Sequence, residues 1–166
     1  MGWATAELLA AKAFGGRFLP VDVTDFAGTE QALADAVGEL GALHVGVTTA
    51  GGGIAARTIG KDGPHDLQEF RDVSELNTVA TFNISRLAAA HMARNEPEDD
   101  ERGVIVNTSS IAAFEGQIGQ VAYTAAFPKR MGRPEEYAKL AVAIVDNPML
   151  NAQCLRLDAG QRFAPR

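Results

Sequence analysis

A serine and a tyrosine lie thirteen positions apart in the second half of the chain, Ser110 and Tyr123. Ser110 follows an apolar run at residues 103–108, and Tyr123 lies on the next predicted helix. In such an arrangement the serine hydroxyl could hold a substrate oxygen while the phenol gives that oxygen a proton or takes one from it. A lone serine or tyrosine at a strand end is usually structural, so this hypothesis depends on the elements around the pair.

Short apolar runs predict four buried strands, at residues 17–22, 43–48, 103–108 and 154–158. Continuous aliphatic and β-branched runs, rather than strict alternation, are typical of a parallel sheet that is covered on both faces. Helical patterns predict the segments between them, at residues 4–13, 33–40, 66–93 and 137–145. The third helix has a predicted break near residue 73. Strands that alternate with helices predict an α/β fold with a doubly wound parallel sheet.

Ligands of a doubly wound sheet bind beyond the carboxyl ends of its strands. The residues that follow Asp22, Val47 and Asn107 are therefore the positions at which the sequence predicts chemistry.

The composition is that of an ordinary globular domain, with 166 residues, 46% hydrophobic and 22% charged, so we expect one domain over residues 1–166. The formal net charge of −6 argues against nucleic acid or an anionic membrane as the main partner, because both attract basic surfaces. The single cysteine, Cys154, excludes an internal disulfide, and no apolar stretch reaches the roughly 18 residues of a membrane span. We expect a soluble, cytoplasmic protein, and the sequence indicates no metal site.

The segment GVIVNTSSIAAFEGQIGQVAYTAA at residues 103–126 contains both Ser110 and Tyr123. Three other distinctive segments are FLPVDVTD at 18–25, ELNTVATFNISRLAA at 75–89 and FPKRMGRPEEYAKLAVAIVDNPMLNAQCLRLDAG at 127–160. Together these four segments resemble the short-chain dehydrogenase/reductase family: the first is similar to its catalytic segment, and the other three match in the family's order. Within the family they resemble the short-chain 3-hydroxyacyl-CoA dehydrogenases, also described as 17β-hydroxysteroid dehydrogenases. The resemblance implies a Rossmann-like fold and an enzyme of fatty acid metabolism. Its reaction is hydride transfer between a nicotinamide cofactor and a secondary alcohol or ketone.

The resemblance implies three catalytic residues. Ser110 would orient the substrate oxygen, and Tyr123 would be the general acid and base. Asn77 would maintain the water and backbone geometry of a proton relay.

The resemblance also implies five cofactor-binding residues. Asp22 and Val23 would contact the adenine ring, and Ala50 and Gly51 would let the cofactor approach the backbone closely. Gly2 would be the last glycine of the pyrophosphate-binding turn. The expected cofactor is NAD, with NADP as the alternative.

The partners that the resemblance implies are a small-molecule substrate, specifically a 3-hydroxyacyl-CoA, and other copies of the chain, since relatives usually form tetramers. Arg57 and Lys61 lie in a loop at residues 57–65, where acyl-CoA-acting relatives carry a basic insertion. These side chains could meet a CoA phosphate, or they could simply belong to a solvated loop.

The chain departs from the family pattern by lacking some of its segments. Gly2 alone stands for the family's glycine-rich turn, so the first strand and the earlier glycines have no counterpart. No segment between residues 13 and 18 matches the second strand and its ribose-binding acidic residue. Thr48 also stands where relatives carry an asparagine, which weakens the expected side-chain tie across the sheet. The expected sheet is therefore incomplete.

The family motif Tyr-x-x-x-Lys is also broken, because Phe127 stands four residues after Tyr123 and Pro128 follows it. A proline disfavours helical geometry at the residue before it, so we expect the helix to end there. The residues that follow match a later part of the family pattern, so we also expect a late core strand to be missing. A free tyrosine has a pKa near ~10, and the family's lysine helps to stabilise the phenolate. Its loss predicts impaired catalysis, with Lys129 as a poor substitute.

Two other readings of the sequence stay open. The chain could be a non-catalytic relative or a truncated gene product that acts only as a binding or subunit-contact module. Among enzymes, a 3-oxoacyl-carrier-protein reductase is the nearest alternative, because it has the same scaffold.

Overall fold

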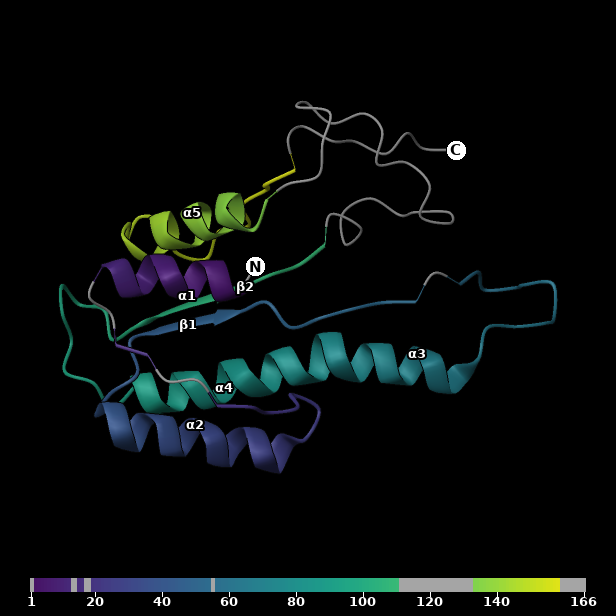
Figure 1. Ribbon diagram of the computed structural model, residues 1–166, viewed down its shortest axis with the longest axis horizontal. Helices are drawn as coiled ribbons and strands as arrows, with labels where there is room; N and C mark the ends of the chain where they lie inside the picture. Colours follow the sequence, from purple (N-terminus) through teal and green to yellow (C-terminus); the bar gives the residue numbers. More distant parts are fainter. Residues whose placement is uncertain (1, 13–14, 17–18, 55, 111–132, 159–166) are drawn as a thin grey trace.

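The computed structural model describes residues 2–12, 15–16, 19–54, 56–110 and 133–158. Its elements are, in chain order, α1 (Gly2–Ala11), α2 (Phe26–Leu40), β1 (Val45–Thr48), α3 (Leu67–Ser74), η1 (Glu75–Val79), α4 (Ala80–Met92), β2 (Val104–Asn107) and α5 (Pro134–Val145). Figure 1 shows the two strands between two layers of helices, with α1 and α5 on one face and α2 and α4 on the other. This is the mixed α/β architecture with a parallel sheet that the sequence predicts.

The sheet consists of β1 and β2, which pair in parallel with Val45 opposite Val104 and Thr48 opposite Asn107. Both strands lie inside the runs that the sequence predicts at residues 43–48 and 103–108. The amide of Asn95 ties their amino ends together, because Nδ2 donates to the carbonyl of Leu43 at 2.7 Å and to that of Arg102 at 2.8 Å. Parallel pairing places both carboxyl ends at one edge of the sheet.

The predicted strands at residues 17–22 and 154–158 are wrong in their described parts, because residues 19–22 and 154–158 form no strand. A strand needs a neighbour, and in a doubly wound sheet the third strand pairs with the second. No segment between residues 13 and 18 matches the family's second strand. Leu155 and Leu157 are accordingly 40% and 54% exposed.

The helices begin and end where local hydrogen bonds favour it. Asp25 caps α2, its Oδ1 accepting from the N–H of Gly28 at 3.0 Å, and Gly41 ends it with φ +86°, a conformation that glycine adopts without strain. The predicted break in the helix at residues 66–93 is a π-helical segment, η1, that joins α3 to α4.

The core is made of small and medium side chains from both layers. Helix α4 packs against both strands and α1 packs closely on α5, with a Lys12–Asp146 ion pair joining that second pair of helices. The buried apolar residues are Ala4, Ala80, Leu87, Ala88, Met92, Val106, Ala138, Ala141 and Val142. No helix in the part of the chain that the structure describes is long and apolar enough to cross a membrane.

Candidate active site

The two strand ends bring the predicted catalytic and cofactor segments to the same edge of the sheet. Ala50 and Gly51 follow β1, and Ser110 follows β2. The pairing continues one residue past the strands, since the N–H of Thr108 donates to the carbonyl of Thr48 at 3.0 Å. Ser110, Ala50 and Gly51 are all exposed, so these segments are accessible to a ligand.

Asn77 joins this edge from the π-helical segment η1. Its Oδ1 accepts from the N–H of Gly52 at 3.0 Å, and its Nδ2 donates to the carbonyl of Gly52 at 2.6 Å and to that of Val73 at 2.9 Å. Single π-helical turns inside α-helices occur frequently at functional sites. The amide therefore fixes the loop after β1 against the helix, and the structure brings Asn77 together with Gly51 and Gly52.

The closeness of Asn77 favours glycine at position 51. An ideal Cβ on Gly51 would lie 2.8 Å from Oδ1 of Asn77, closer than real Cβ contacts. Glycine thus lets the loop backbone lie against the amide, where a larger residue would push the amide away.

Gly2 also lies beside the end of β1. An ideal Cβ on Gly2 would lie 2.9 Å from Oγ1 of Thr49, so the amino end of α1 faces the loop after that strand. Helix amino ends with free N–H groups attract phosphate groups. The structure therefore places Gly2 beside Thr49, one residue before Ala50.

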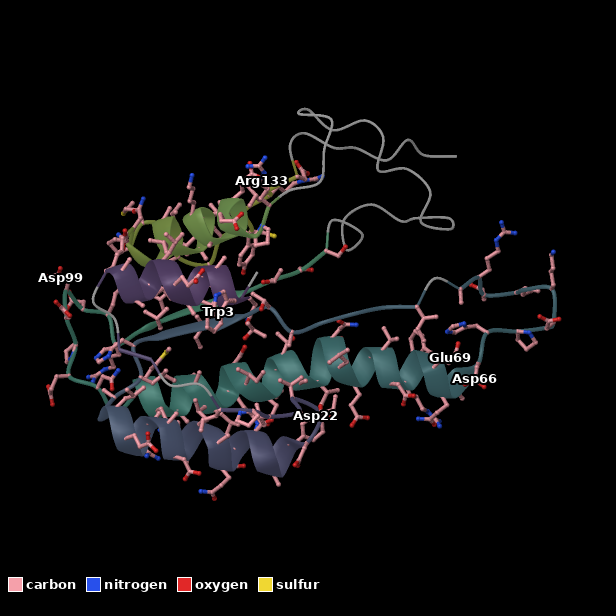
Figure 2. All side chains as sticks on the ribbon, in the orientation of Figure 1. Trp3, Asp22, Asp66, Glu69, Asp99 and Arg133 are labelled. Atoms are coloured by element: carbon pink, nitrogen blue, oxygen red, sulfur yellow. The ribbon has the colours of Figure 1, made fainter. Side chains whose placement is uncertain are left out.

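Asp22 and Val23 lie at the start of α2. The carbonyl of Asp22 accepts from the N–H of Asp25 at 3.0 Å. Figure 2 shows Asp22 beside α2, whereas Trp3 lies on α1. The Asp22 carboxylate accepts from the N–H of Thr24 at 2.9 Å and from its hydroxyl at 2.7 Å. Both bonds lower the pKa of Asp22 from its usual 3.8, and the bond from the backbone N–H has the larger effect. Within the described residues, the hydrogen bonds of Asp22 are with Thr24, Asp25 and Thr29, and none of these residues follows β1 or β2.

The structure adds two residues at this edge that the sequence did not single out, Thr108 and Tyr137. The hydroxyl of Thr108 donates to the carbonyl of Thr48 at 2.7 Å and lies 2.6 Å from the phenol oxygen of Tyr137. Tyr137 belongs to the predicted apolar face of α5. A phenol on a core-facing position needs a hydrogen-bond partner. This need is the feature of the sequence that could have indicated a polar contact for Tyr137.

The loop before α3 forms a hollow beside the site. Its backbone closes through bonds from the N–H of His65 to the carbonyl of Thr58 at 2.9 Å and from the N–H of Gly60 to that of Gly63 at 2.8 Å. Arg57 and Lys61 are exposed. The hollow has a volume of about 390 Å³, and its lining residues are Ile54, Ala56, Thr58, His65, Phe70 and Val73.

Tyr123 lies outside the described residues, as do Phe127, Pro128 and Lys129. The described ranges bring together no group of three or more His, Cys, Asp or Glu side chains that could hold a metal ion.

The model of the short chain dehydrogenase family matches residues 3–128, most of the chain. The chain belongs to the short-chain dehydrogenase family. It is 36% identical over 211 aligned positions to the 3-hydroxyacyl-CoA dehydrogenase type-2 of Drosophila melanogaster, covering 93% of this chain and 83% of that one. Because this alignment is longer than the 166-residue chain, the fly protein has segments inside the matched region that are absent here.

Solved structures of short-chain dehydrogenases support the same assignment. The 3-hydroxyacyl-CoA dehydrogenase type-2 from Mycobacterium avium is 29% identical and superposes with a TM-score of 0.88, covering 99% of this chain and 92% of that chain. ElxO with NADP bound is 25% identical with a TM-score of 0.53, over 63% of this chain and 39% of that chain. The chain is thus an oxidoreductase of Rossmann-like fold, and these matches support a nicotinamide cofactor.

Proposed function

We propose that the chain binds NAD(H) and acts on the hydroxyl or carbonyl group of a 3-hydroxyacyl-CoA, with a low rate of turnover. The observation that carries the proposal is the contact between Asn77 and the Gly51–Gly52 backbone at the carboxyl ends of the two strands. Ser110 follows β2 at this same edge of the sheet. The similarity to proteins named 3-hydroxyacyl-CoA dehydrogenase type-2 supports the substrate class.

Two side chains would carry out the proton chemistry, and a third would hold the site in place. Ser110 would donate a hydrogen bond to the substrate oxygen, and Tyr123 would give that oxygen a proton or take one from it. Asn77 would act by holding the loop after β1 in place, since its side chain already makes three hydrogen bonds to backbone groups.

The residues present fit a dinucleotide, because the amino end of α1 at Gly2 faces the loop after β1 and helix amino ends attract phosphate groups. Gly2, Ala50 and Gly51 would hold the pyrophosphate and nicotinamide side, and Asp22 and Val23 would contact the adenine. When bound, the cofactor would supply or accept the hydride. We assign NAD, the cofactor that the resemblance to 3-hydroxyacyl-CoA dehydrogenases implies, with NADP as the alternative.

Turnover would be low because Phe127 stands in the place of the family's lysine. Each unit by which a cation lowers the tyrosine pKa corresponds to about 1.4 kcal/mol of stabilisation of the phenolate. A base left at the ordinary tyrosine pKa is ionised in roughly one molecule per thousand at neutral pH. We therefore expect kcat to be lower by roughly a hundredfold to a thousandfold than in relatives that keep the lysine.

The test measures NAD and NADP binding by titration and then turnover of a short 3-hydroxyacyl-CoA by NADH absorbance. We expect saturable binding that is tighter for NAD, and slow turnover that Ser110→Ala and Tyr123→Phe abolish. Turnover of a 3-oxoacyl-carrier-protein but not of the CoA thioester would favour the reductase alternative. Turnover at the rate of lysine-containing relatives would contradict the low-rate proposal.

A second candidate function is cofactor binding without catalysis. The observation that favours it is the sequence Phe127-Pro128, which lacks the lysine and limits the helix that would carry Tyr123. Saturable NAD binding with no detectable turnover, unchanged by Tyr123→Phe, would establish this function in place of the first.

A further inference from the structure

A chain of hydrogen bonds crosses the edge of the sheet from α5 to β1. The Thr108 hydroxyl donates to the carbonyl of Thr48 at 2.7 Å and lies 2.6 Å from the phenol oxygen of Tyr137. A hydroxyl has one proton to donate. Because Thr108 gives its proton to Thr48, the phenol of Tyr137 must be the donor in the second bond. The order is therefore Tyr137 to Thr108 to Thr48.

This chain of bonds joins the two segments on which the candidate site depends. Thr48 precedes the Thr49–Gly51 loop by one residue, and Thr108 stands two residues before Ser110. The N–H of Thr108 also donates to the carbonyl of Thr48 at 3.0 Å, so this one carbonyl accepts both bonds from Thr108. A carbonyl oxygen has two lone pairs, and both are occupied here.

The phenol determines which way the Thr108 hydroxyl points. Side-chain torsions of threonine fall into a few staggered positions, and only a position facing the sheet edge allows the bond to Thr48. Donation from Tyr137 favours that position and helix α5 supports the phenol, since α5 contacts β2 directly. Thr48 is 6% exposed and Tyr137 is half-buried, so water competes weakly for these bonds.

We infer that Tyr137 is a positioning residue: through the Thr108 hydroxyl it sets the separation between the loop after β1, which carries Ala50 and Gly51, and the segment after β2, which carries Ser110. The inference rests on the proposed function for the roles of those loops. It adds a dependence of the site on α5, an element that contributes no side chain to the proposed chemistry.

The test uses Tyr137→Phe, Thr108→Val and their double variant, with Thr108→Ser as the variant that keeps the hydroxyl. The matched control is Ser85→Ala. It removes two hydrogen bonds on the α4 side of the same strand end, one of 3.1 Å from Nδ2 of Asn107 and one of 3.3 Å to Oδ1 of Asn107. It leaves the chain of bonds to Thr48 intact. Each variant is measured by its NADH dissociation constant, its thermal midpoint and the rate of amide hydrogen exchange at residues 45–53 and 104–110.

We expect Tyr137→Phe and Thr108→Val each to raise the NADH dissociation constant roughly fivefold, as loss of one partly buried hydrogen bond implies. The double variant should bind no worse than the weaker single variant, because both changes remove the same link. Thr108→Ser and Ser85→Ala should stay within about twofold of the parent chain, although Ser85→Ala lowers the thermal midpoint. Exchange should become faster at residues 108–110 and 49–52 in Tyr137→Phe.

A Tyr137→Phe variant with unchanged NADH affinity and unchanged exchange at those amides would overturn the inference, as would fully additive effects in the double variant. If the parent chain binds neither NADH nor NADPH, the proposed function fails. The exchange rates then decide the positioning role by themselves. If Tyr137→Phe does not fold, the comparison of Thr108→Val with Thr108→Ser decides it.

Discussion

Gly51 is a position where a single added methyl group should have a large effect. Its Cβ would lie 2.8 Å from Oδ1 of Asn77, whereas a Cβ on Gly53 would meet nothing within 4 Å. We expect Gly51→Ala to destabilise the fold by about 1–3 kcal/mol through overpacking, and Gly53→Ala to stay within about 0.5 kcal/mol of the parent. Urea unfolding of the two variants measures this difference. Equal stabilities would show that the amide of Asn77 can move away freely.

The carboxylate of Asp22 allows a second prediction for a single residue. Its lowered pKa depends first on the backbone N–H of Thr24 and then on the hydroxyl of Thr24. Thr24→Ala keeps the first bond, so the pKa of Asp22 should rise part of the way towards 3.8. Because the folded state lowers this pKa, the stabilising contribution is present above pH 3.8 and is lost as the pH falls through the folded-state pKa. Carboxyl chemical shifts of Asp22 against pH measure the change, and an unchanged midpoint would exclude a role for the hydroxyl.

Sequence spacing indicated some of the site residues and could not indicate others. Asn77 and the segment of Ala50 and Gly51 were predicted and do meet in the structure. The Thr108–Tyr137 bond joins residues 29 positions apart, and no local pattern specifies which buried phenol meets which hydroxyl. Such a contact depends on how α5 packs on β2, which is a property of the assembled layers.

At the scale of elements, the packing of α1 on α5 offers a test within one helix. Ala138 is fully buried, while Ala143 on the same helix is exposed. Ala138→Leu should therefore cost about 1–3 kcal/mol of unfolding free energy, and Ala143→Leu should be nearly neutral, within about 0.5 kcal/mol. Thermal unfolding of the two variants provides the comparison. A similar loss in both would mean that helix propensity, rather than the contact with α1, decides the stability of α5.

Periodicity predicted the helices well because each helix contains its own hydrogen bonds and its own caps. The same reasoning failed for the described parts of two predicted strands, residues 19–22 and 154–158, although their composition resembles that of β1 and β2. A strand is stable only when another strand completes its hydrogen bonds, and β1 and β2 complete each other. The apolar runs were therefore necessary for strands but not sufficient, and the missing information was the presence of a neighbour.

For the molecule as a whole, the question is whether a sheet of two described strands supports a site that responds to its cofactor. A ligand that binds only the folded state stabilises it by about 2.7 kcal/mol at a concentration one hundred times its dissociation constant. For a chain of this size each kcal/mol raises the thermal midpoint by roughly 2–4 °C. Saturating NAD should therefore raise a cooperative midpoint by roughly 5–10 °C, as measured by near-ultraviolet circular dichroism.

The matched glycine variants make that shift specific to the strand-end site. Gly53→Ala should keep the NAD-induced rise, because its added methyl group meets open space. Gly51→Ala should lose most of it even after its lower starting midpoint is taken into account, because the displaced amide of Asn77 would no longer hold the Gly52 backbone. A larger shift with NADP than with NAD would reverse the cofactor assignment. An equal rise in both glycine variants would mean that NAD binds elsewhere on the molecule, since only one of the two substitutions disturbs the loop that follows β1.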